Sequence, residues 1–252
     1  MGQAIMYEVK DHVAHITLNR PEKKNAINSA MRKELQDAFA DVKFNKDVWL
    51  AILTGRGDTF CAGKDLFDKM EFDGTLMPGE ELYEYLRHIY KPIIVALNGP
   101  CLAQGAGFAM VADIVLMSDC ASIGWPQVKR GISSNSGPTY FAHAVPWNQA
   151  MGYLMRGTMV SAEDALRMGI ANEVVPHDSL QEAAQRWASE ILANAPLAVQ
   201  GIKEAARRGE AKAALDRMHI ARYVVARVTA SHDAKEGIQA FKEKRKPGWK
   251  GV

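Results

Sequence analysis

The 252-residue chain is predicted to be an α/β protein with a strand-and-helix core followed by a helical region. Strand-like runs, loops and helical patterns recur through the first part, with connections long enough for parallel pairing. From residue 146 onward the pattern is mostly helical. The hydrophobic content of 48 % and the charged content of 24 % are typical of a globular protein with one large domain, or one domain and an appendage. We divide the chain into a core at 1–195 and a helical region at 196–252.

The first elements follow from hydrophobic periodicity. Two alternating strands are predicted within 7–20, around Asp11, and Pro21 ends the second. A helix begins near Ser29, a plausible N-cap, and has one apolar face formed by Met31, Leu35, Ala38, Phe39 and Val42. The pattern then predicts a buried strand at 48–55, a loop at 56–67, a helix around 79–90, a strand at 92–99, a helix at 105–113 and a strand at 114–119.

Helices dominate the rest of the chain. The segments 161–169 and 179–194 each begin at a serine that can cap a helix. A long amphipathic helix is predicted over 211–245, with Val224, Val225 and Val228 on one side. That apolar side packs either on a partner subunit or on its own domain.

Composition and charge exclude several classes of protein. The net charge of +2 gives no overall field for binding nucleic acid. Three cysteines without CxxC spacing make a disulfide framework or a zinc site unexpected, and no metal is predicted. No signal peptide or membrane span is expected, which predicts a cytoplasmic protein without a membrane partner. The basic segment 242–251 is either a solvated end or a contact surface.

Two glycine-containing segments carry unusual local chemistry. In 60–66, Gly63 allows backbone N–H groups to point into a pocket. In 98–107, the amides of Ala103 to Gly107 lie at a predicted helix start. Two donors converging from separate loops would form an oxyanion hole, whereas the alternative is simple close packing of the glycines. Neither segment has the spacing of a phosphate-binding loop.

Six blocks along the chain belong with these two segments: "ITLNRPEKKNAINSAM", "ILTGRGDTFCAGKDL", "KPIIVALNGPCLAQGAGFAMVADIVLMSDCASIGWPQVKRGI", "SAEDALRMGIANEVVP", "NAPLAVQGIKEA" and "KEGIQAFKEKRKPGWKG". In their order and spacing they resemble the enoyl-CoA hydratase/isomerase (crotonase) superfamily. The resemblance implies a spiral of ββα units that binds acyl-CoA in 1–195. It also implies a C-terminal helical region in 196–252 that builds trimers, often paired into hexamers.

The resemblance also assigns roles to residues. The enolate oxygen of an acyl-CoA thioester is expected to accept from the backbone N–H groups of Lys64 and Gln104. The Gln104 side chain, unusual at this position, either points away or trims the pocket. Coenzyme A enters as part of the substrate, with no tightly bound cofactor. The expected CoA contacts are Lys24, Ala26, Ala62, Asp65 and Leu66, joined by Phe241 and Lys244 from a neighbouring subunit.

The chain departs from the family where hydration needs an acid and a base. The two hydratase glutamates fall at Gly107 and Gln127, and a third acidic position of some members falls near Asn135. We therefore expect an enzyme of the hydratase/isomerase type that keeps the oxyanion hole without the standard carboxylates. The sequence leaves open which reaction it catalyses. The alternatives are a decarboxylase or hydrolase that uses the polar loop 133–136, and a CoA-binding protein without catalysis. The loop itself is either a binding wall or a turn, and a replacement acid or base could come from Glu80, Glu81, Glu84 or His88.

Overall fold

A mixed six-stranded sheet forms the centre of the protein. The computed structural model describes residues 3–68 and 80–252. The strand order is β1-β2-β3-β4-β6-β9, in which β1 pairs antiparallel with β2 and all other neighbours are parallel. The expected parallel core is thus confirmed. The strands are β1 (Ile5–Lys10), β2 (Val13–Leu18), β3 (Leu50–Gly55), β4 (Ile93–Leu97), β6 (Ile114–Ser118) and β9 (Glu173–Val175).

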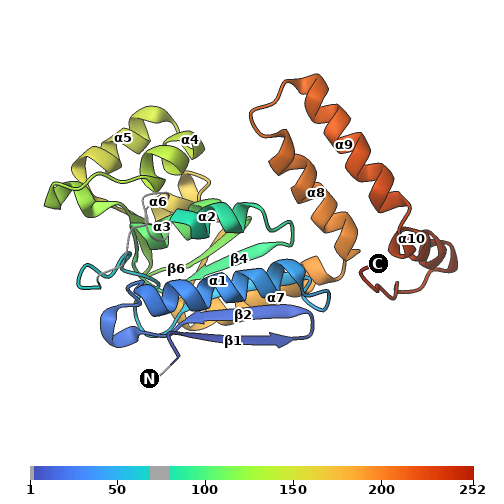
Figure 1. The fold of residues 1–252 in the computed structure, drawn as a ribbon, viewed down its shortest axis with the longest axis horizontal. Coiled ribbons are helices and arrows are strands. Elements are labelled where there is room, and N and C mark those ends of the chain that lie inside the picture. Colours follow the sequence, from blue (N-terminus) through green and yellow to red (C-terminus); the bar gives the residue numbers. More distant parts are fainter. Residues whose placement is uncertain (1–2, 69–79) are drawn as a thin grey trace.

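Helices cover both faces of this sheet (Figure 1). Side chains of a strand alternate between the two faces of a sheet. Since both faces are covered here, β3 is buried along its whole length. Leu50 and Ile52 pack with α7 (Leu180–Leu192), whereas Ala51 and Leu53 belong to the larger core on the other face. That larger core also contains α1 (Ser29–Phe44), α2 (Glu80–Arg87) and α3 (Gln104–Val111).

A small second sheet and short helices stand beside the main sheet. The second sheet has the order β5-β7-β8. These strands are β5 (Cys101–Leu102), β7 (Ser122–Gly124) and β8 (Met159–Ser161), and the helices are α4 (Ala142–Ala144), α5 (Trp147–Arg156) and α6 (Ala162–Arg167). Short 3₁₀ turns occur at Pro21–Lys23, Pro126–Arg130 and His177–Ser179, and a π-helical turn at Gly137–Phe141.

The last three helices form an arm that projects from the body of the protein (Figure 1). They are α8 (Pro196–Gly209), α9 (Ala214–Thr229) and α10 (His232–Glu243). The predicted single helix over 211–245 is therefore wrong, because Ser231 caps a new helix by accepting from the Ala234 amide. The predicted shared face is also wrong: Val224 and Val228 pack near Gly201, but Val225 is 59 % exposed.

The capping predictions have mixed outcomes. Asn28, and not Ser29, caps α1 by accepting from the Met31 amide, and the Ser29 hydroxyl donates to Asp68 instead. Ser161 caps α6 as expected, whereas Ser179 makes no side-chain cap on α7. The predicted apolar face of α1 is confirmed in full. Within the part of the chain that the structure describes, no helix has the length and apolar character needed to cross a membrane.

Candidate active site

A pocket of about 750 Å³ lies where β3 and β4 end. The carboxyl ends of parallel strands meet at one edge of a sheet, so the loops that follow β3 and β4 come together there. Cys61 and Cys101 form an isolated parallel bridge, and the Leu102 amide donates to the Cys61 carbonyl over 2.8 Å. Most of the lining comes from four segments: 23–26, 62–67, 102–104 and 132–136.

Asn25 anchors the first of these segments to the loop after β3. It is fully buried, with a left-handed φ of 53°. Its side-chain amide donates to the carbonyls of Arg56 and Thr59 at 2.9 and 2.7 Å, and its side-chain oxygen accepts from the Arg20 amide at 2.9 Å. Every polar atom of this buried side chain is therefore used to hold two loops in register.

The backbone around Lys64 is held in a parallel bridge with Ile27. Ile27 donates to the Gly63 carbonyl at 2.8 Å, and Asp65 donates to the Ile27 carbonyl at 2.9 Å. In such a bridge the N–H of the middle residue, Lys64, points to the opposite side. Gly63, with φ of 95°, makes the turn, and a Cβ built there would lie 3.6 Å from the Gln104 nitrogen. The two loops thus meet at the backbone.

The start of α3 supplies the second loop. Gln104 is its first residue, where backbone N–H groups point out of the helix end. The preceding Ala103 has φ of 54° and ψ of −109°, an unfavourable conformation for alanine. The Ala103 carbonyl accepts from the Gly107 amide at 3.1 Å and from the Ser136 hydroxyl at 3.3 Å. Trp125 donates in turn to Ser136 at 2.8 Å, which ties the 133–136 loop to the helix start.

Positive charge predominates on the described lining of the pocket. Its cations outnumber its one carboxylate, Asp65, which pairs with Arg20 at 3.1 Å outside the lining. An anionic ligand therefore gains from the field of this pocket. The lining cations are Lys23, Lys24, Lys64 and Arg130.

Neither a thiol nucleophile nor a metal centre is indicated. Burial raises the pKa of the Cys61 thiol to about 12, so this thiol remains protonated beside the pocket. Within residues 3–68 and 80–252, no group of three side chains is placed to hold a metal ion.

Nine of the residues that the sequence predicts for the site line the pocket. The catalytic candidates Lys64, Gln104, Gln127 and Asn135 do so. So do the CoA-contact candidates Lys24, Ala26, Ala62, Asp65 and Leu66. Two of the backbone groups expected to surround CoA are already joined, because the Ala62 amide donates to the Lys24 carbonyl at 2.9 Å.

The two positions at which the resemblance places the hydratase glutamates have distinct surroundings. A Cβ built on Gly107 would lie 2.5 Å from Tyr83, so the space beside this glycine is filled. Gln127 has a buried Oε1 that accepts no hydrogen bond from any residue the structure describes. This oxygen is an acceptor available to a ligand or a water at the pocket wall.

Two of the four candidate replacement acids and bases, Glu84 and His88, do not line the pocket. Glu84 accepts from the Tyr140 hydroxyl at 2.9 Å, and the His88 ring lies 2.7 Å from the Glu84 carbonyl. Neither reaches the described lining, so the hypothesis fails for these two residues. The side chains of Glu80 and Glu81 lie outside the description.

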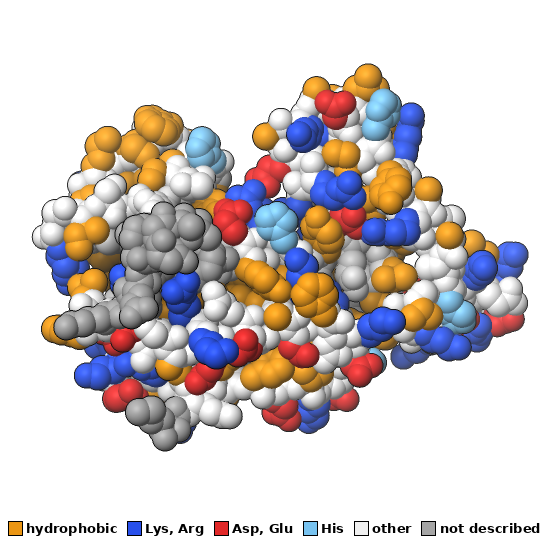
Figure 2. All heavy atoms as spheres, in the orientation of Figure 1, with side chains coloured by type: hydrophobic (Ala, Val, Ile, Leu, Met, Phe, Trp, Pro, Cys, Tyr) orange, Lys and Arg blue, Asp and Glu red, His pale blue; other side chains and the backbone are white. Residues whose placement is uncertain are grey.

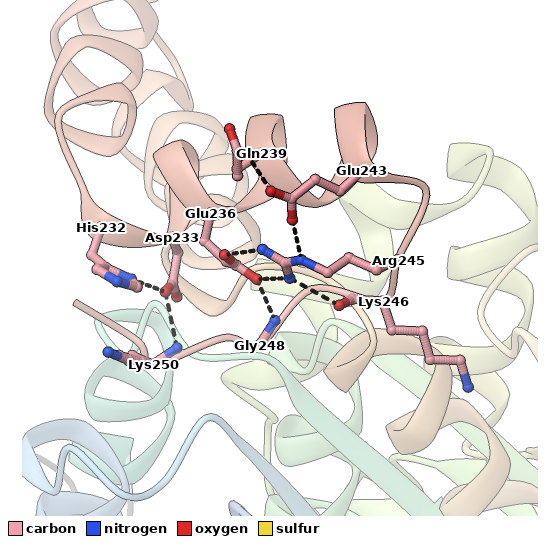
Figure 3. Close-up of polar contacts among 9 residues, drawn as sticks. All are labelled: His232, Asp233, Glu236, Gln239, Glu243, Arg245, Lys246, Gly248 and Lys250. Atoms are coloured by element: carbon pink, nitrogen blue, oxygen red, sulfur yellow. Dashed lines mark hydrogen bonds and ion pairs between the residues drawn. The ribbon is translucent and has the colours of Figure 1, made fainter.

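Phe241 lies on α10 and Lys244 is the C-cap that follows it, so both belong to the arm, and neither lines the pocket of their own chain. Phe241 is 85 % exposed. The basic segment after α10 is folded back on this helix (Figure 3): Arg245 forms a two-pronged ion pair with Glu236 at 2.6 and 2.9 Å. Gly248 also donates to Glu236, at 2.7 Å. The segment is thus an ordered surface and not a free end.

Sequence reasoning missed two residues. Asn25 has a signal, since asparagine is enriched at positive φ, but its hydrogen bonds cross to distant loops. Tyr83 has a weaker signal: the resemblance predicts a glutamate at Gly107, so another side chain has to fill the space that the glutamate would occupy.

An α/β fold with a cationic pocket at the ends of its parallel strands is suited to binding an anionic small molecule. A profile described as enoyl-CoA hydratase/isomerase matches residues 8–252. The chain is 33 % identical over 257 residues to (E)-benzylidenesuccinyl-CoA hydratase of Thauera aromatica, with 98 % of this chain and 99 % of that protein covered. It is 31 % identical over 246 residues to 2,3-dehydroadipyl-CoA hydratase of Escherichia coli K12, with 96 % of each covered.

Solved structures agree with these sequence relatives. The crystal structure of an enoyl-CoA hydratase/isomerase from Mycobacterium paratuberculosis matches with a TM-score of 0.92 at 34 % identity, covering 100 % of this chain and 99 % of that one. The chain therefore belongs to the enoyl-CoA hydratase/isomerase family of enzymes, and the expected crotonase fold is confirmed. Membership implies a CoA thioester as substrate.

Proposed function

We propose that this enzyme stabilises the enolate of an acyl-CoA thioester with the backbone N–H groups of Lys64 and Gln104. The observation that carries the proposal is the meeting of the two loops, with Gly63 close to the Gln104 nitrogen and the Lys64 N–H turned away from Ile27. Backbone donors fixed before the reaction stabilise charge as it develops, and such a donor is commonly worth about 3–4 kcal/mol of barrier.

The reaction proceeds without the hydratase pair of carboxylates. Gly107 has no side chain, and Gln127 exchanges no proton usefully near neutral pH. The Gln127 Oε1 instead accepts a hydrogen bond from the substrate or from a water. Hydration of a simple enoyl thioester is consequently slow in this enzyme, although the relatives above are named hydratases.

Decarboxylation or hydrolysis is the second candidate, favoured by the polar wall of Ser133, Ser134 and Asn135. In a decarboxylation the bond from the α-carbon to the carboxylate breaks and carbon dioxide leaves. The electron pair passes to the thioester oxygen in the hole, and water returns a proton to the α-carbon. No strong base is needed, which suits a pocket whose one described carboxylate is paired with Arg20.

We further propose that the chain forms a homotrimer, or a dimer of trimers, in which Phe241 and Lys244 reach a neighbour's nucleotide site. Exposed apolar side chains on the arm support this (Figure 2). The exposed Lys244 supplies a mobile positive charge suited to phosphate. These exposed apolar residues are Ile202, Leu215, Met218, Tyr223, Val225, Ile238 and Phe241.

The test separates binding, enolate formation and hydration. Butyryl-CoA should bind, and malonyl-CoA should release carbon dioxide, because this route to the enolate needs no base. Crotonyl-CoA should be hydrated far more slowly than by a good hydratase. Lys64→Ala and Gln104→Ala keep the backbone donors, so the release of carbon dioxide should survive within a few-fold in both. Rapid crotonyl-CoA hydration would refute the assignment of Gly107 and Gln127. Loss of carbon dioxide release in both variants, with butyryl-CoA still bound, would refute the backbone hole.

A further inference from the structure

Tyr83 fills the space beside Gly107 on the wall of the pocket. Tyr83 lies on α2 and is 4 % exposed, and Gly107 lies on α3. A Cβ built on Gly107 would lie 2.5 Å from the Tyr83 Cζ and 2.9 Å from its hydroxyl oxygen. Real Cβ atoms do not approach other atoms so closely, so no side chain fits at 107 while the ring holds this position. The absence of a side chain at Gly107 therefore makes room for the phenol ring of Tyr83.

Neighbouring aromatic rings fix the orientation of Tyr83. Its ring makes edge-to-face contacts with Phe108, at a centroid distance of 5.3 Å, and with Tyr140, at 6.5 Å. Tyr140 is itself held by its hydrogen bond to Glu84, and the Arg87 guanidinium lies 5.3 Å from its ring centroid. Such packing restricts rotation of a buried ring, so its hydroxyl has a fixed place.

The phenol lies close to the proposed enolate site. Gly107 is three residues after Gln104 on α3, and side-chain positions with this spacing on a helix are about 5–6 Å apart. Tyr83 and Gln104 both line the pocket, as do the polar residues Gln127 and Asn135. The Tyr83 hydroxyl, 2.9 Å from the Cβ position of Gly107, is therefore close enough for an acyl group whose thioester oxygen sits at the Gln104 amide to reach it.

We propose that Tyr83 determines substrate specificity: its hydroxyl donates a hydrogen bond to an oxygen on the acyl chain, at or next to the β-carbon. This inference rests on the proposed function and names the substrate class of that site. The substrate is an oxygen-bearing acyl-CoA and not a plain alkyl or alkenyl thioester. Gly107 is needed for the same role, because any side chain there would displace the phenol ring of Tyr83.

Two thioesters of equal chain length test the inference: acetoacetyl-CoA, which has a β-oxygen, and butyryl-CoA, which lacks it. Their dissociation constants are measured by calorimetry. Tyr83→Phe should weaken acetoacetyl-CoA by about tenfold and leave butyryl-CoA nearly unchanged, since one hydrogen bond is lost. Equal effects on both ligands, or none, would overturn the role of Tyr83. If the wild-type enzyme binds neither thioester, the proposed function itself fails, and the inference with it.

Tyr153→Phe is the matched control. It removes the same hydroxyl from a ring that donates to Asp164 and does not line the pocket. The ratio of the butyryl-CoA dissociation constant to the acetoacetyl-CoA dissociation constant should therefore stay at the wild-type value. Gly107→Ala should lower this ratio as Tyr83→Phe does. It should also lower the melting temperature, and by more in the wild-type protein than in a Tyr83→Ala variant, where the ring that it would displace is absent. A Gly107→Ala protein with both ligand affinities and melting temperature unchanged would refute the steric link.

Discussion

Ala103→Gly is expected to stabilise the protein, because Ala103 holds a strained backbone where the two loops of the site meet. Its φ of 54° and ψ of −109° cost a non-glycine residue about 1–3 kcal/mol. Glycine adopts such a conformation readily, but its freer unfolded chain costs about 0.4–1 kcal/mol. The difference leaves a net gain of about 1 kcal/mol, which for a chain of this size is a rise in melting temperature of about 2–4 °C.

The assay is denaturant unfolding of both proteins, with calorimetry as a second measurement. Ala112→Gly is the matched control at the other end of α3, where φ is −62° and there is no left-handed strain to relieve. This control should lose at least about 0.4–1 kcal/mol, because the unfolded-state cost remains, the Ala112 methyl packs on the core and no strain is released.

The sign of the change decides the outcome. If Ala103→Gly lowers the free energy of unfolding as much as Ala112→Gly does, the strain at Ala103 is not there to be released. A gain in stability with slower release of carbon dioxide from malonyl-CoA would fit a site in which Ala103 holds the Gln104 amide in place, since stability is commonly traded against preorganisation.

Three further predictions concern the pocket and the arm. Gln127→Glu should raise crotonyl-CoA hydration above the wild-type rate, because it restores a proton-transferring group; no gain with intact butyryl-CoA binding would count against this position. Asn25→Ala should cost about 3 kcal/mol in denaturant unfolding, because it leaves the Thr59 carbonyl and two other backbone groups without their partner; a loss below 1 kcal/mol would contradict its anchoring role. Hydrogen bonds from Arg245 and the Gly248 amide lower the pKa of Glu236 to about 2, so docking of residues 246–252 should be complete above pH 4.5 and weaken as the pH falls toward 2. Hydrogen exchange of that segment measures this, and Glu236→Gln should show fast exchange already at neutral pH.

Local patterns predicted the elements of the core well. The five buried residues of α1 followed from helical spacing alone, because one face of a helix has to be apolar when it covers a sheet. The cap of α1 was misplaced by one residue because Asn28 and Ser29 are both capping types, and only the partner of each side chain separates them. Val224 and Val225 are about 100° apart on a helix, so they cannot share one face equally.

The position of the pocket-lining loops was predictable, because the segment around Gly63 and the start of α3 carry their signal in short motifs. The contact between Tyr83 and Gly107 joins two helices, so no local pattern in either segment contains it. Phe241 and Lys244 stay a prediction, because their proposed target lies on another chain.

The proposed backbone donors and the side chains around them differ in how they tolerate change. The proposed Lys64 and Gln104 donors are backbone groups, so side chains there can vary while Gly63 and Ala103 keep the positions of the N–H groups. Proton transfer depends on side chains, and neither Gly107 nor Gln127 can supply it near neutral pH. On this proposal the enzyme stabilises an enolate but depends on its substrate for the bond-breaking step. A substrate with an additional oxygen, held by Tyr83, can supply that step by losing a group whose bond to the α-carbon breaks without a base.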